Sequence, residues 1–482
     1  MADLDQKKKQ LMDIYNKYKK IAIQFCDLKD YEAALGVTSA IASLMYQINQ
    51  IYVDEELESI IKKCAEDYIV YPHNDAKLRN DTIVFYDEFG FDTRGLAFIY
   101  LKALCENGYR IVYVTRSYRK GKIPLILDVL EQNEENEIIY LERGSYKEEA
   151  ETVLQIVNNS NACAIFIYDM PQGIVGSIVP NVLQGKGVIS YKINLTDHAF
   201  WLGARATDYV IEFRDFGASV SKFFRGIEED RLIKLPYLPC IDESLEFQGF
   251  PFNPENKKII FSGGGIYKTI GGGDIYYQLV RIILSKYSDV VFWYAGSGDS
   301  PQMKQLIEDF PERVFWTEER RDLWQVMKRC YFYLNTYPIT GGLMVQYAVK
   351  AGKVPMTLRH DAASGGTLNN ADILECEYED IDTLIEQIDR VMRNPDYLKV
   401  LESKTGNQVI SWEDFSNNIN SIIKTHDTDC GITLKKQDLS NFVEVYLNNF
   451  DMSRVKRVIY TKRTEEKLNS IGDELPLQVL SD

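Results

Sequence analysis

Residues Tyr331–Asn370 have the sequence YFYLNTYPITGGLMVQYAVKAGKVPMTLRHDAASGGTLNN, which decides the fold class. Tyr331–Leu334 is apolar, β-favouring and too short for a helix, and Asn335–Pro338 is typical of a turn. The run from Gly341 to Gly352 predicts a helix, and Val354–Leu358 predicts a second short strand. The order strand, turn, helix, strand is the βαβ repeat of an open parallel sheet.

The predicted helix has almost no polar face, so we expect it to pack against the sheet. Its apolar residues are Leu343, Met344, Val345, Tyr347, Ala348 and Val349. Its glycine-lined N-terminus then lies at the carboxyl ends of the strands, where free N–H groups and the helix dipole favour negative charge. The sequence therefore predicts an anion site at this edge of the sheet.

Predicted strands alternate with segments long enough for crossover helices over most of the chain. The first series is Ile83–Tyr86, Ile111–Val114, Ile138–Leu141, Ala164–Tyr168, Val188–Ile193 and Tyr209–Phe213. The second series is Ile259–Phe261, Val290–Tyr294, Val314–Trp316, Tyr331–Leu334 and Val354–Leu358. Each series predicts one Rossmann-like domain, so we expect an α/β protein whose two domains face a ligand-binding cleft.

These patterns also suggest domain boundaries. We predict an N-terminal helical segment at residues 1–75, a Rossmann-like domain at 76–241, a linker at 242–256, a second Rossmann-like domain at 257–400, and C-terminal helices with a tail at 401–482. Apolar residues recur at helical spacing in three runs between Gln6 and Asp67. Such a helical bundle packs on the core or on another subunit, which leaves a homo- or hetero-oligomer open.

Composition narrows the class of protein. The 482 residues include 55 basic and 71 acidic side chains, and 55 − 71 gives a net charge of −16, which argues against nucleic acid as the main partner. No apolar run reaches the ~18 residues that span a bilayer, and the first residues lack the apolar core of a signal peptide. The eight cysteines form no CxxC pair. We therefore expect a soluble, cytoplasmic protein with free thiols and no transmembrane segment.

A glycine cluster follows the first strand of the second domain. Ser262 is followed by three glycines, including Gly263 and Gly264, and Lys268 comes shortly after. Glycines let a backbone approach a phosphate closely, and lysine supplies a compact positive charge. A flexible surface turn is the alternative interpretation. The chain has no Walker A pattern, so nucleotide hydrolysis by a P-loop is not expected.

Three polar residues of the first domain are candidates for catalysis. Asp197 and His198 follow a predicted strand, and imidazole can act as a general base or donate to a departing diphosphate. Glu88 lies after the first strand in YDEFGFDTRG, where a carboxylate can serve as base or bind an acceptor. The alternatives are a hydrogen-bonded structural histidine and turn capping by carboxylates such as Asp87 and Asp92.

The run LNTYPITGGLMVQYAVKAGKVPMTLRHDAASGG resembles the sugar-nucleotide motif of GT-B glycosyltransferases, in particular the O-GlcNAc transferase and cytoplasmic N-glucosyltransferase group. FSGGGIYK, TDHAFWLG and LPYLP agree with that family in order and spacing. The resemblance covers roughly residues 82–400 and implies a nucleotide-sugar-binding second domain, an acceptor-side first domain and inversion at the anomeric carbon.

The resemblance implies roles for several residues of the second domain. Lys268 matches the lysine that contacts the diphosphate, and the helix N-terminus matches the phosphate site. The implied donor-binding residues are Gly263, Gly264, Lys268, Thr317, Arg321, Thr340, Gly341, Gly342, Gln346 and Arg359. Thr317 and Arg321 correspond to the uracil loop, for which a solvated helix start is the alternative interpretation. Arg359 is expected near the donor sugar or the phosphates.

The chain departs from the family pattern in two places. Leu343 and Met344 replace the polar side chains that the family carries beside the glycine. The acidic residue that holds the ribose corresponds to Tyr347, and its neighbour Gln346 is the candidate substitute. Both departures bear on nucleotide affinity.

No Asp-x-Asp pattern ends a strand of the second domain, so we predict transfer without a metal ion, the helix dipole and Lys268 acting in place of the cation. The UDP-sugar is a co-substrate, and no separate cofactor is expected. The predicted function is transfer of a hexose or N-acetylhexosamine from a UDP-sugar to a protein side chain or a glycan hydroxyl. Two alternatives stay open: a catalytically silent partner protein that binds a transferase or an acceptor polypeptide, and a UDP-sugar epimerase.

Overall fold

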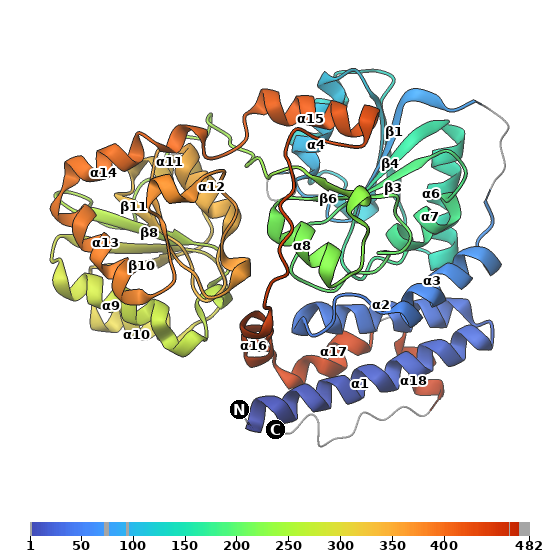
Figure 1. The fold of residues 1–482 in the computed structure, drawn as a ribbon, viewed down its shortest axis with the longest axis horizontal. Coiled ribbons are helices and arrows are strands. Elements are labelled where there is room, and N and C mark those ends of the chain that lie inside the picture. Colours follow the sequence, from blue (N-terminus) through green and yellow to red (C-terminus); the bar gives the residue numbers. More distant parts are fainter. Residues whose placement is uncertain (1, 72–76, 93–95, 462, 472–482) are drawn as a thin grey trace. The chain divides into compact units, whose positions relative to one another are not determined.

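A computed structural model describes residues 2–71, 77–92, 96–461 and 463–471 of the chain. The chain forms two compact units. The first unit comprises Met1–Leu235, Glu413–Gln437 and Phe450–Asp482, and the second comprises Pro236–Trp412 and Asp438–Asn449. Each unit is built on its own parallel sheet, and Figure 1 shows the two sheets with their helices.

The first unit contains a seven-stranded parallel sheet in the order β3-β2-β1-β4-β5-β6-β7. Its strands are β1 (Arg79–Asp87), β2 (Arg110–Arg116), β3 (Glu137–Leu141), β4 (Ala162–Tyr168), β5 (Ile189–Ile193), β6 (Tyr209–Glu212) and β7 (Leu232–Lys234). The helices around it are α4 (Ala97–Glu106), α5 (Pro124–Leu130), α6 (Tyr146–Asn159), α7 (Val175–Leu183), α8 (Asp215–Phe223) and α15 (Trp412–Thr425). The predicted strands are confirmed, and β7 is an addition to them.

A ladder of aromatic rings crosses the middle of this sheet. Phe85, Phe166, Tyr191 and Tyr209 lie in register on β1, β4, β5 and β6, and neighbouring rings have centroids 6.0, 4.9 and 5.6 Å apart. His426, just after α15, stacks on Tyr209 with ring centroids 4.7 Å apart. Aromatic stacking across strands stabilises a sheet beyond simple burial. The stacking of His426 on Tyr209 also explains why the segment after α15 belongs to the first unit.

The N-terminal helices pack with the C-terminal helices of the same unit, as Figure 1 shows. They are α1 (Ala2–Asp27), α2 (Tyr31–Ile48), α3 (Glu55–Asp67), α17 (Val455–Ile459) and α18 (Glu465–Ser470). The buried Glu58 carboxylate of α3 accepts backbone N–H groups of Gly203 at 2.9 Å and Arg205 at 3.2 Å. This contact fixes the helices to the loop after β5, and the three predicted N-terminal helices are confirmed.

The second unit contains a six-stranded sheet in the order β10-β9-β8-β11-β12-β13. Its strands are β8 (Lys258–Gly263), β9 (Val290–Ala295), β10 (Val314–Thr317), β11 (Phe332–Leu334), β12 (Pro355–Leu358) and β13 (Glu377–Tyr378). Its helices are α9 (Ile275–Lys286), α10 (Pro301–Asp309), α11 (Leu323–Arg329), α12 (Gly342–Lys350), α13 (Ile381–Arg393), α14 (Pro395–Glu402) and α16 (Ser440–Asn449). The βαβ unit predicted from Tyr331–Asn370 is therefore β11, α12 and β12.

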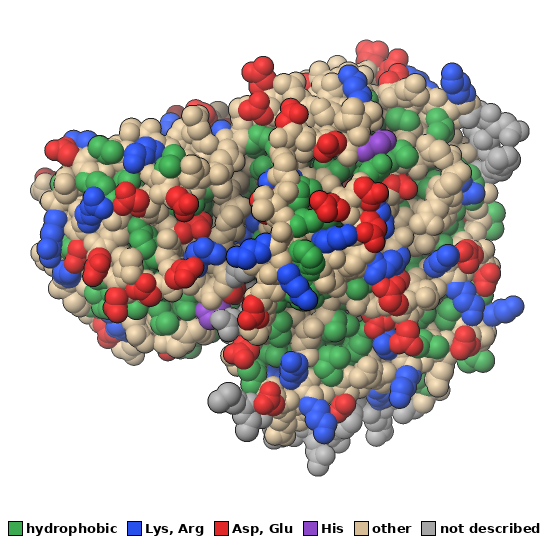
Figure 2. Space-filling view, viewed as in Figure 1, with side chains coloured by type: hydrophobic (Ala, Val, Ile, Leu, Met, Phe, Trp, Pro, Cys, Tyr) green, Lys and Arg blue, Asp and Glu red, His purple; other side chains and the backbone are tan. Residues whose placement is uncertain are grey.

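Two surface properties agree with the composition. Among the residues that the structure describes, no helix is long and apolar enough to cross a membrane. On the face drawn in Figure 2, acidic and basic side chains are interspersed, so that face offers no extended basic surface for a nucleic acid.

Candidate functional site

The triple glycine after β8 packs against the loop after β9. Gly264 N–H donates to the Ala295 carbonyl at 3.0 Å, and Ile266 N–H donates to the Ser297 carbonyl at 2.9 Å. A Cβ placed on Gly296 would lie 1.8 Å from the Gly264 carbonyl oxygen, so only glycine permits this backbone contact. The cluster is thus a hydrogen-bonded part of the sheet edge, which argues against a flexible surface turn.

Lys268 lies in a short helical turn, Ile266–Thr269, that contacts the segment leading into α12. Its carbonyl accepts the Ile339 N–H at 3.2 Å. Its ammonium group makes no hydrogen bond or ion pair with any residue of the described ranges, and burial lowers its pKa. A desolvated cation without a counter-ion is unfavourable, so this position favours an anionic ligand.

The turn before α12 is organised by Asn335, which the sequence analysis assigned only to a turn. Its buried Oδ1 accepts N–H groups of Thr336 and Gly341, both at 2.9 Å, and its Nδ2 donates to Thr357 Oγ1 at 3.2 Å. No side chain caps α12. In the part of the chain that the structure describes, the N–H groups of residues 342–344 have no hydrogen-bond acceptor.

These donors and Lys268 are close in the structure. Ile339, which bonds to the Lys268 carbonyl, lies three residues before Gly342, and the half-buried Thr340 lies between them. The structure thus brings Lys268 and the predicted phosphate-binding turn to one edge of the sheet. Helix N–H groups and an ammonium group together are suited to a diphosphate.

Gln346 has a polar atom without a hydrogen-bond partner among the described residues, whereas the Tyr347 hydroxyl has one. The buried Gln346 amide nitrogen donates to the carbonyls of Tyr237 at 3.2 Å and Thr367 at 2.9 Å, and its Oε1 has no partner among the described residues. The Tyr347 hydroxyl donates to the Cys240 carbonyl. The buried amide oxygen of Gln346 thus lacks a donor among the described residues, whereas Tyr347 is committed within the protein.

The two residues predicted to bind uracil, Thr317 and Arg321, lie in different environments. The Thr317 hydroxyl accepts the indole N–H of Trp293 at 3.0 Å, and Arg321 is exposed without a partner in the described ranges. The neighbouring Arg320 forms a bidentate pair with the buried Asp322, with both contacts at 2.7 Å. Arg320 therefore stabilises the loop, and the side chain of Thr317 has a structural contact.

Arg359 lies just after β12. Its N–H donates to the Tyr378 carbonyl at 2.7 Å, and a guanidinium nitrogen lies 4.0 Å from Glu379. Its buried Nε has no partner among the residues described. His360, next in the chain, lies 3.0 Å from the Tyr337 hydroxyl, so this loop also reaches the turn before α12.

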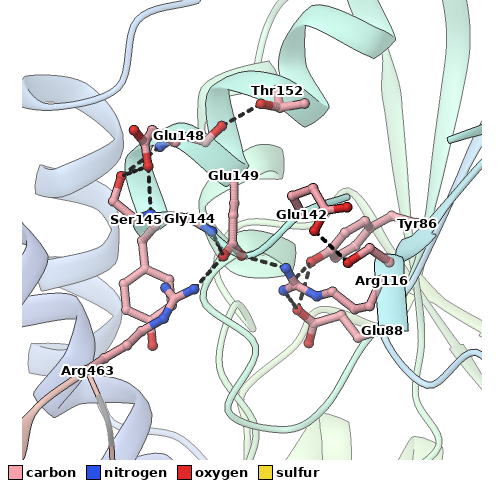
Figure 3. Close-up of polar contacts among 12 residues, drawn as sticks. Tyr86, Glu88, Arg116, Glu142, Gly144, Ser145, Glu148, Glu149, Thr152 and Arg463 are labelled. Carbon is pink, nitrogen blue, oxygen red and sulfur yellow. Dashed lines mark hydrogen bonds and ion pairs between the residues drawn. The ribbon is translucent and has the colours of Figure 1, made fainter. Parts of the chain in front are cut away.

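Glu88 is one end of a charged network in the first unit, which Figure 3 shows. Arg116 bonds to Glu88 through one terminal nitrogen, and its other terminal nitrogen contacts the buried Glu149 of α6 at 2.6 Å. Arg463 binds the other side of Glu149, and the Tyr86 hydroxyl donates to Glu88 at 2.7 Å. None of the four residues joined to Glu88 in this network was expected from the sequence.

Asp197 and His198 form an orienting pair. The Asp197 carboxylate accepts from Arg214 Nε at 2.7 Å, and one of its oxygens lies 3.3 Å from His198 Nδ1. Burial acts to raise the pKa of Asp197, but Arg214 and His198 outweigh it and hold that pKa below its usual range. The imidazole is 24% exposed and can therefore meet a substrate.

A second carboxylate lies near Glu88 that the sequence analysis did not select. Asp169 follows β4, the neighbour of β1, and the Met170 N–H is 3.4 Å from Glu88. Asp169 pairs with the buried Lys192, and burial, offset in part by Lys192, raises its pKa to about 6. The signal that could have found it is its position directly after a predicted strand.

The other two carboxylates of the β1 loop have capping roles. Asp87 accepts the N–H groups of Phe89 and Gly90, both at 2.8 Å, and burial raises its pKa to about 6. Asp92 accepts the N–H of Leu125 at the start of α5. Turn and helix capping, the alternative interpretation, therefore describes these two residues.

Comparisons with known proteins place the fold. No family model and no curated protein matches the sequence. A mutant O-GlcNAc transferase of Thermobaculum terrenum aligns over 94% of this chain and 85% of its own, with a TM-score of 0.50 and 13% identity. A Rickettsia africae glycosyltransferase covers 80% of this chain and 100% of its own (TM-score 0.49, 10% identity), and S. aureus MnaA with UDP covers 72% and 96% (0.48, 12%).

The two parallel sheets and the first of these likenesses define the class: the chain has the GT-B fold. It is glycosyltransferase-like in architecture, as the resemblance of its motifs implied. Within the described ranges, no group of three or more His, Cys, Asp or Glu side chains is arranged to hold a metal ion.

Proposed function

We propose that this chain is a glycosyltransferase that moves a hexose or N-acetylhexosamine from a UDP-sugar to a protein side chain or a glycan hydroxyl. The observation that carries the proposal is the desolvated ammonium group of Lys268 without a counter-ion, joined through Ile339 to the uncapped N-terminus of α12. Both features favour the diphosphate of the donor. Positive charge placed in advance at a leaving group stabilises the transition state.

The donor is bound by residues at the edge of the second sheet. Lys268 and the N–H groups of residues 342–344 bind the diphosphate, with Thr340 beside them. Gln346 accepts a hydrogen bond from a ribose hydroxyl through its unpartnered Oε1. Arg359 lies near the donor sugar or the phosphates. Tyr347 takes no part, because its hydroxyl is bonded to Cys240.

His198 is the proposed general base. The ionised Asp197 accepts a hydrogen bond from the Nδ1–H of His198, which leaves Nε2 as the nitrogen that takes the proton of the acceptor hydroxyl. The acceptor oxygen then bonds to the anomeric carbon as the bond from that carbon to the diphosphate oxygen breaks. The electron pair leaves with UDP, where Lys268 and the amides stabilise it.

The leaving group is stabilised by protein groups, so activity is proposed to be metal-independent. Release of UDP from a panel of UDP-sugars is expected to proceed fully in excess EDTA. Loss of activity on chelation that Mg²⁺ restores would contradict this part of the proposal and leave the fold assignment intact.

The experiment that tests the whole proposal separates binding from turnover. Calorimetry with UDP is expected to show binding by the wild-type protein and by His198→Ala, whereas His198→Ala loses UDP release. A variant of the exposed Lys257, Lys257→Met, is the matched control and retains both. If wild-type protein shows no heat and no thermal shift with UDP, the silent partner protein is the correct alternative.

A second candidate is a UDP-sugar epimerase, which requires a pair of carboxylates. Glu88 and Asp169 meet this requirement, because they follow neighbouring strands and the Met170 N–H links them. Each carboxylate is paired with a cation, Arg116 or Lys192, which is less suited to proton removal from a sugar carbon. Conversion of the donor without any acceptor would favour this candidate.

A further inference from the structure

Basic and aromatic side chains gather after three neighbouring strands of the first unit. The segment Arg116–Lys122 has the sequence RSYRKGK, with four cations and no acidic residue in a chain of net charge −16. It begins at the last residue of β2, whose neighbours are β1 and β3. Arg143 comes shortly after β3, so another cation lies at this edge of the sheet.

Most of these cations have no counter-ion. Arg116 is committed to Glu88 and Glu149, as described above. The side chains of Arg119, Lys120, Lys122 and Arg143 make no ion pair with any residue that the structure describes. The nearby Glu142 accepts the Ser117 hydroxyl at 2.8 Å, and Asp92 caps α5. The buried Asp87 accepts N–H groups of its own turn and also attracts the Arg119 charge, so the four cations still outnumber Glu142, Asp92 and Asp87.

Arg119 is fixed in place between two exposed rings. Its guanidinium carbon lies 4.4 Å from the Phe91 ring centroid and 4.9 Å from the Tyr118 ring centroid. Its stem packs on Gly90, where a Cβ would lie 2.6 Å from Arg119 Cγ. Tyr118 is 58% exposed and Phe91 is 39% exposed, and the buried Nε of Arg119 has no partner within the described residues.

Lys120 repeats the pairing of cation and ring, because its ammonium group lies 5.8 Å from the ring centroid of Tyr140 on β3. Rings and cations therefore alternate across β1, β2 and β3, a distance of about 10 Å at the usual spacing of strands. A ring stacked on a guanidinium leaves the donor edge of the arginine for a carboxylate or phosphate.

We propose that Phe91, Tyr118, Arg119 and Lys120 form a binding surface for a glycan that carries carboxylate or phosphate groups. The inference rests on the proposed function, because this glycan is the acceptor substrate. The cations bind its acidic groups, and the exposed ring faces stack on the apolar faces of its sugar rings. An acidic polypeptide would use the same charges without needing the rings, and this difference defines the test.

The test measures binding by calorimetry without any UDP-sugar. The probes are an oligosaccharide of alternating uronic acid and N-acetylhexosamine, a phosphodiester-linked mannan oligosaccharide, a neutral chitin oligosaccharide of equal length, and polyglutamate. We expect one of the two acidic glycans to bind best, with affinity falling as salt rises. The probe that binds best distinguishes carboxylate from phosphate as the acidic group.

Variants distinguish the contribution of the aromatic rings to glycan binding from that of the charges. Tyr118→Ala and Arg119→Met are each expected to weaken binding of the acidic glycan about tenfold, and Arg119→Met alone weakens any binding of polyglutamate. Lys257→Met, which removes an exposed cation of the second unit, leaves the affinity unchanged. Lys120→Gln replaces Arg119→Met if the latter lowers the melting temperature, since Arg119 packs on Gly90.

Three results would overturn the inference: no binding of either acidic glycan, no loss with Tyr118→Ala, or tighter binding of polyglutamate. The proposed function fails separately. If UDP does not bind but the acidic glycan does, the surface is a glycan-binding site of a protein that is not a transferase. If UDP is released from UDP-sugars while both glycans fail to bind, the transferase uses another acceptor.

Discussion

Buried and half-buried charges at the carboxyl edges of the two sheets differ in whether they are paired within the protein. At the edge of the seven-stranded sheet, carboxylates are paired with cations, as in the half-buried Glu88 with Arg116 and the buried Asp169 with Lys192. At the edge of the six-stranded sheet, Lys268 is desolvated and has no counter-ion in the described ranges. The α12 N-terminus beside it is uncapped.

The difference shows at which edge a buried or half-buried charge is left for an external partner; the surface cations after β2 and β3 are a separate feature of the first unit. A paired network is electrically satisfied, so its residues act by position and by their contacts with one another. The half-buried Lys268 and the free N–H groups beside it have no acceptor among the described residues, so an anion is the partner that suits both. This contrast supports the proposed diphosphate site at the second sheet, whereas the paired residues of the first sheet have a geometry fixed by their contacts.

The largest expected effect is on stability, at the paired edge. Glu149→Gln removes the carboxylate between Arg116 and Arg463 and leaves two guanidinium groups together. We expect the free energy of unfolding to fall by about 3 kcal/mol, as when one partner of a buried ion pair is removed. Chemical denaturation measures this change.

Glu142→Gln is the matched control, since this exposed carboxylate accepts only the Ser117 hydroxyl among the residues described. It is expected to change stability by less than about 0.5 kcal/mol. Equally small effects of the two variants would show that the ion pairs of Glu149, drawn in Figure 3, do not contribute to folding stability.

At the unpaired edge, the expected sign is reversed. Lys268→Met removes a desolvated cation that has no partner to lose, so the ligand-free protein is expected to be equally or more stable. The affinity for UDP, measured by calorimetry, is expected to fall about 100-fold because a charge-assisted contact is lost. A loss of stability with unchanged UDP affinity would make Lys268 a structural residue.

A smaller effect, about tenfold per pH unit, is expected in the pH dependence of UDP binding. Burial lowers the pKa of Lys268, so its charge is lost at a lower pH than the ~10.4 of an unperturbed lysine. UDP affinity of the wild-type protein is therefore expected to fall as the pH rises through this lowered pKa. Lys268→Met, titrated in parallel, should show no such fall beyond that of UDP itself.

The sign for stability follows from the same shift. The unfolded chain binds a proton at Lys268 more tightly than the folded protein does, so stability rises with pH between the two pKa values. The stability advantage of Lys268→Met over the wild-type protein is thus present below the folded pKa. It should disappear as the pH approaches ~10.4.

Much of the fold was predictable because it depends on local patterns. Short β-favouring runs and intervening helical segments identified both sheets, and the glycines near Gly342 located the α12 N-terminus. β7 and β13 were missed because Leu232–Lys234 and Glu377–Tyr378 are too short to show a pattern. Their strand character comes from pairing with β6 and β12.

The site was predictable only in part, because its contacts join distant segments. A glycine cluster and a lysine indicated an anion site, but nothing in the sequence joined the Lys268 carbonyl to Ile339. Likewise, no spacing relates Glu88 to Glu149 or Arg463, which are joined through Arg116 and through the contact of a C-terminal segment with α6. Buried charges are paired by tertiary structure, which local sequence does not encode.

The smallest expected effect concerns the ribose position. The resemblance aligned the family's acidic residue with Tyr347, but the structure commits that hydroxyl to the Cys240 carbonyl and leaves the Gln346 Oε1 without a partner. Tyr347→Phe should therefore cost about 1 kcal/mol of stability, the value of one hydrogen bond, and change UDP affinity by less than about twofold.

Gln346→Leu is the variant to compare with Tyr347→Phe. It removes the unsatisfied oxygen and also the hydrogen bonds that the amide nitrogen donates to the Tyr237 and Thr367 carbonyls. It is expected to weaken UDP several-fold, and to weaken uridine by the same factor but pyrophosphate not at all. If Tyr347→Phe weakens UDP more than Gln346→Leu does, the ribose contact lies with the tyrosine. The edge of the six-stranded sheet would then offer unpaired donors to the phosphates but no unpaired acceptor to the ribose.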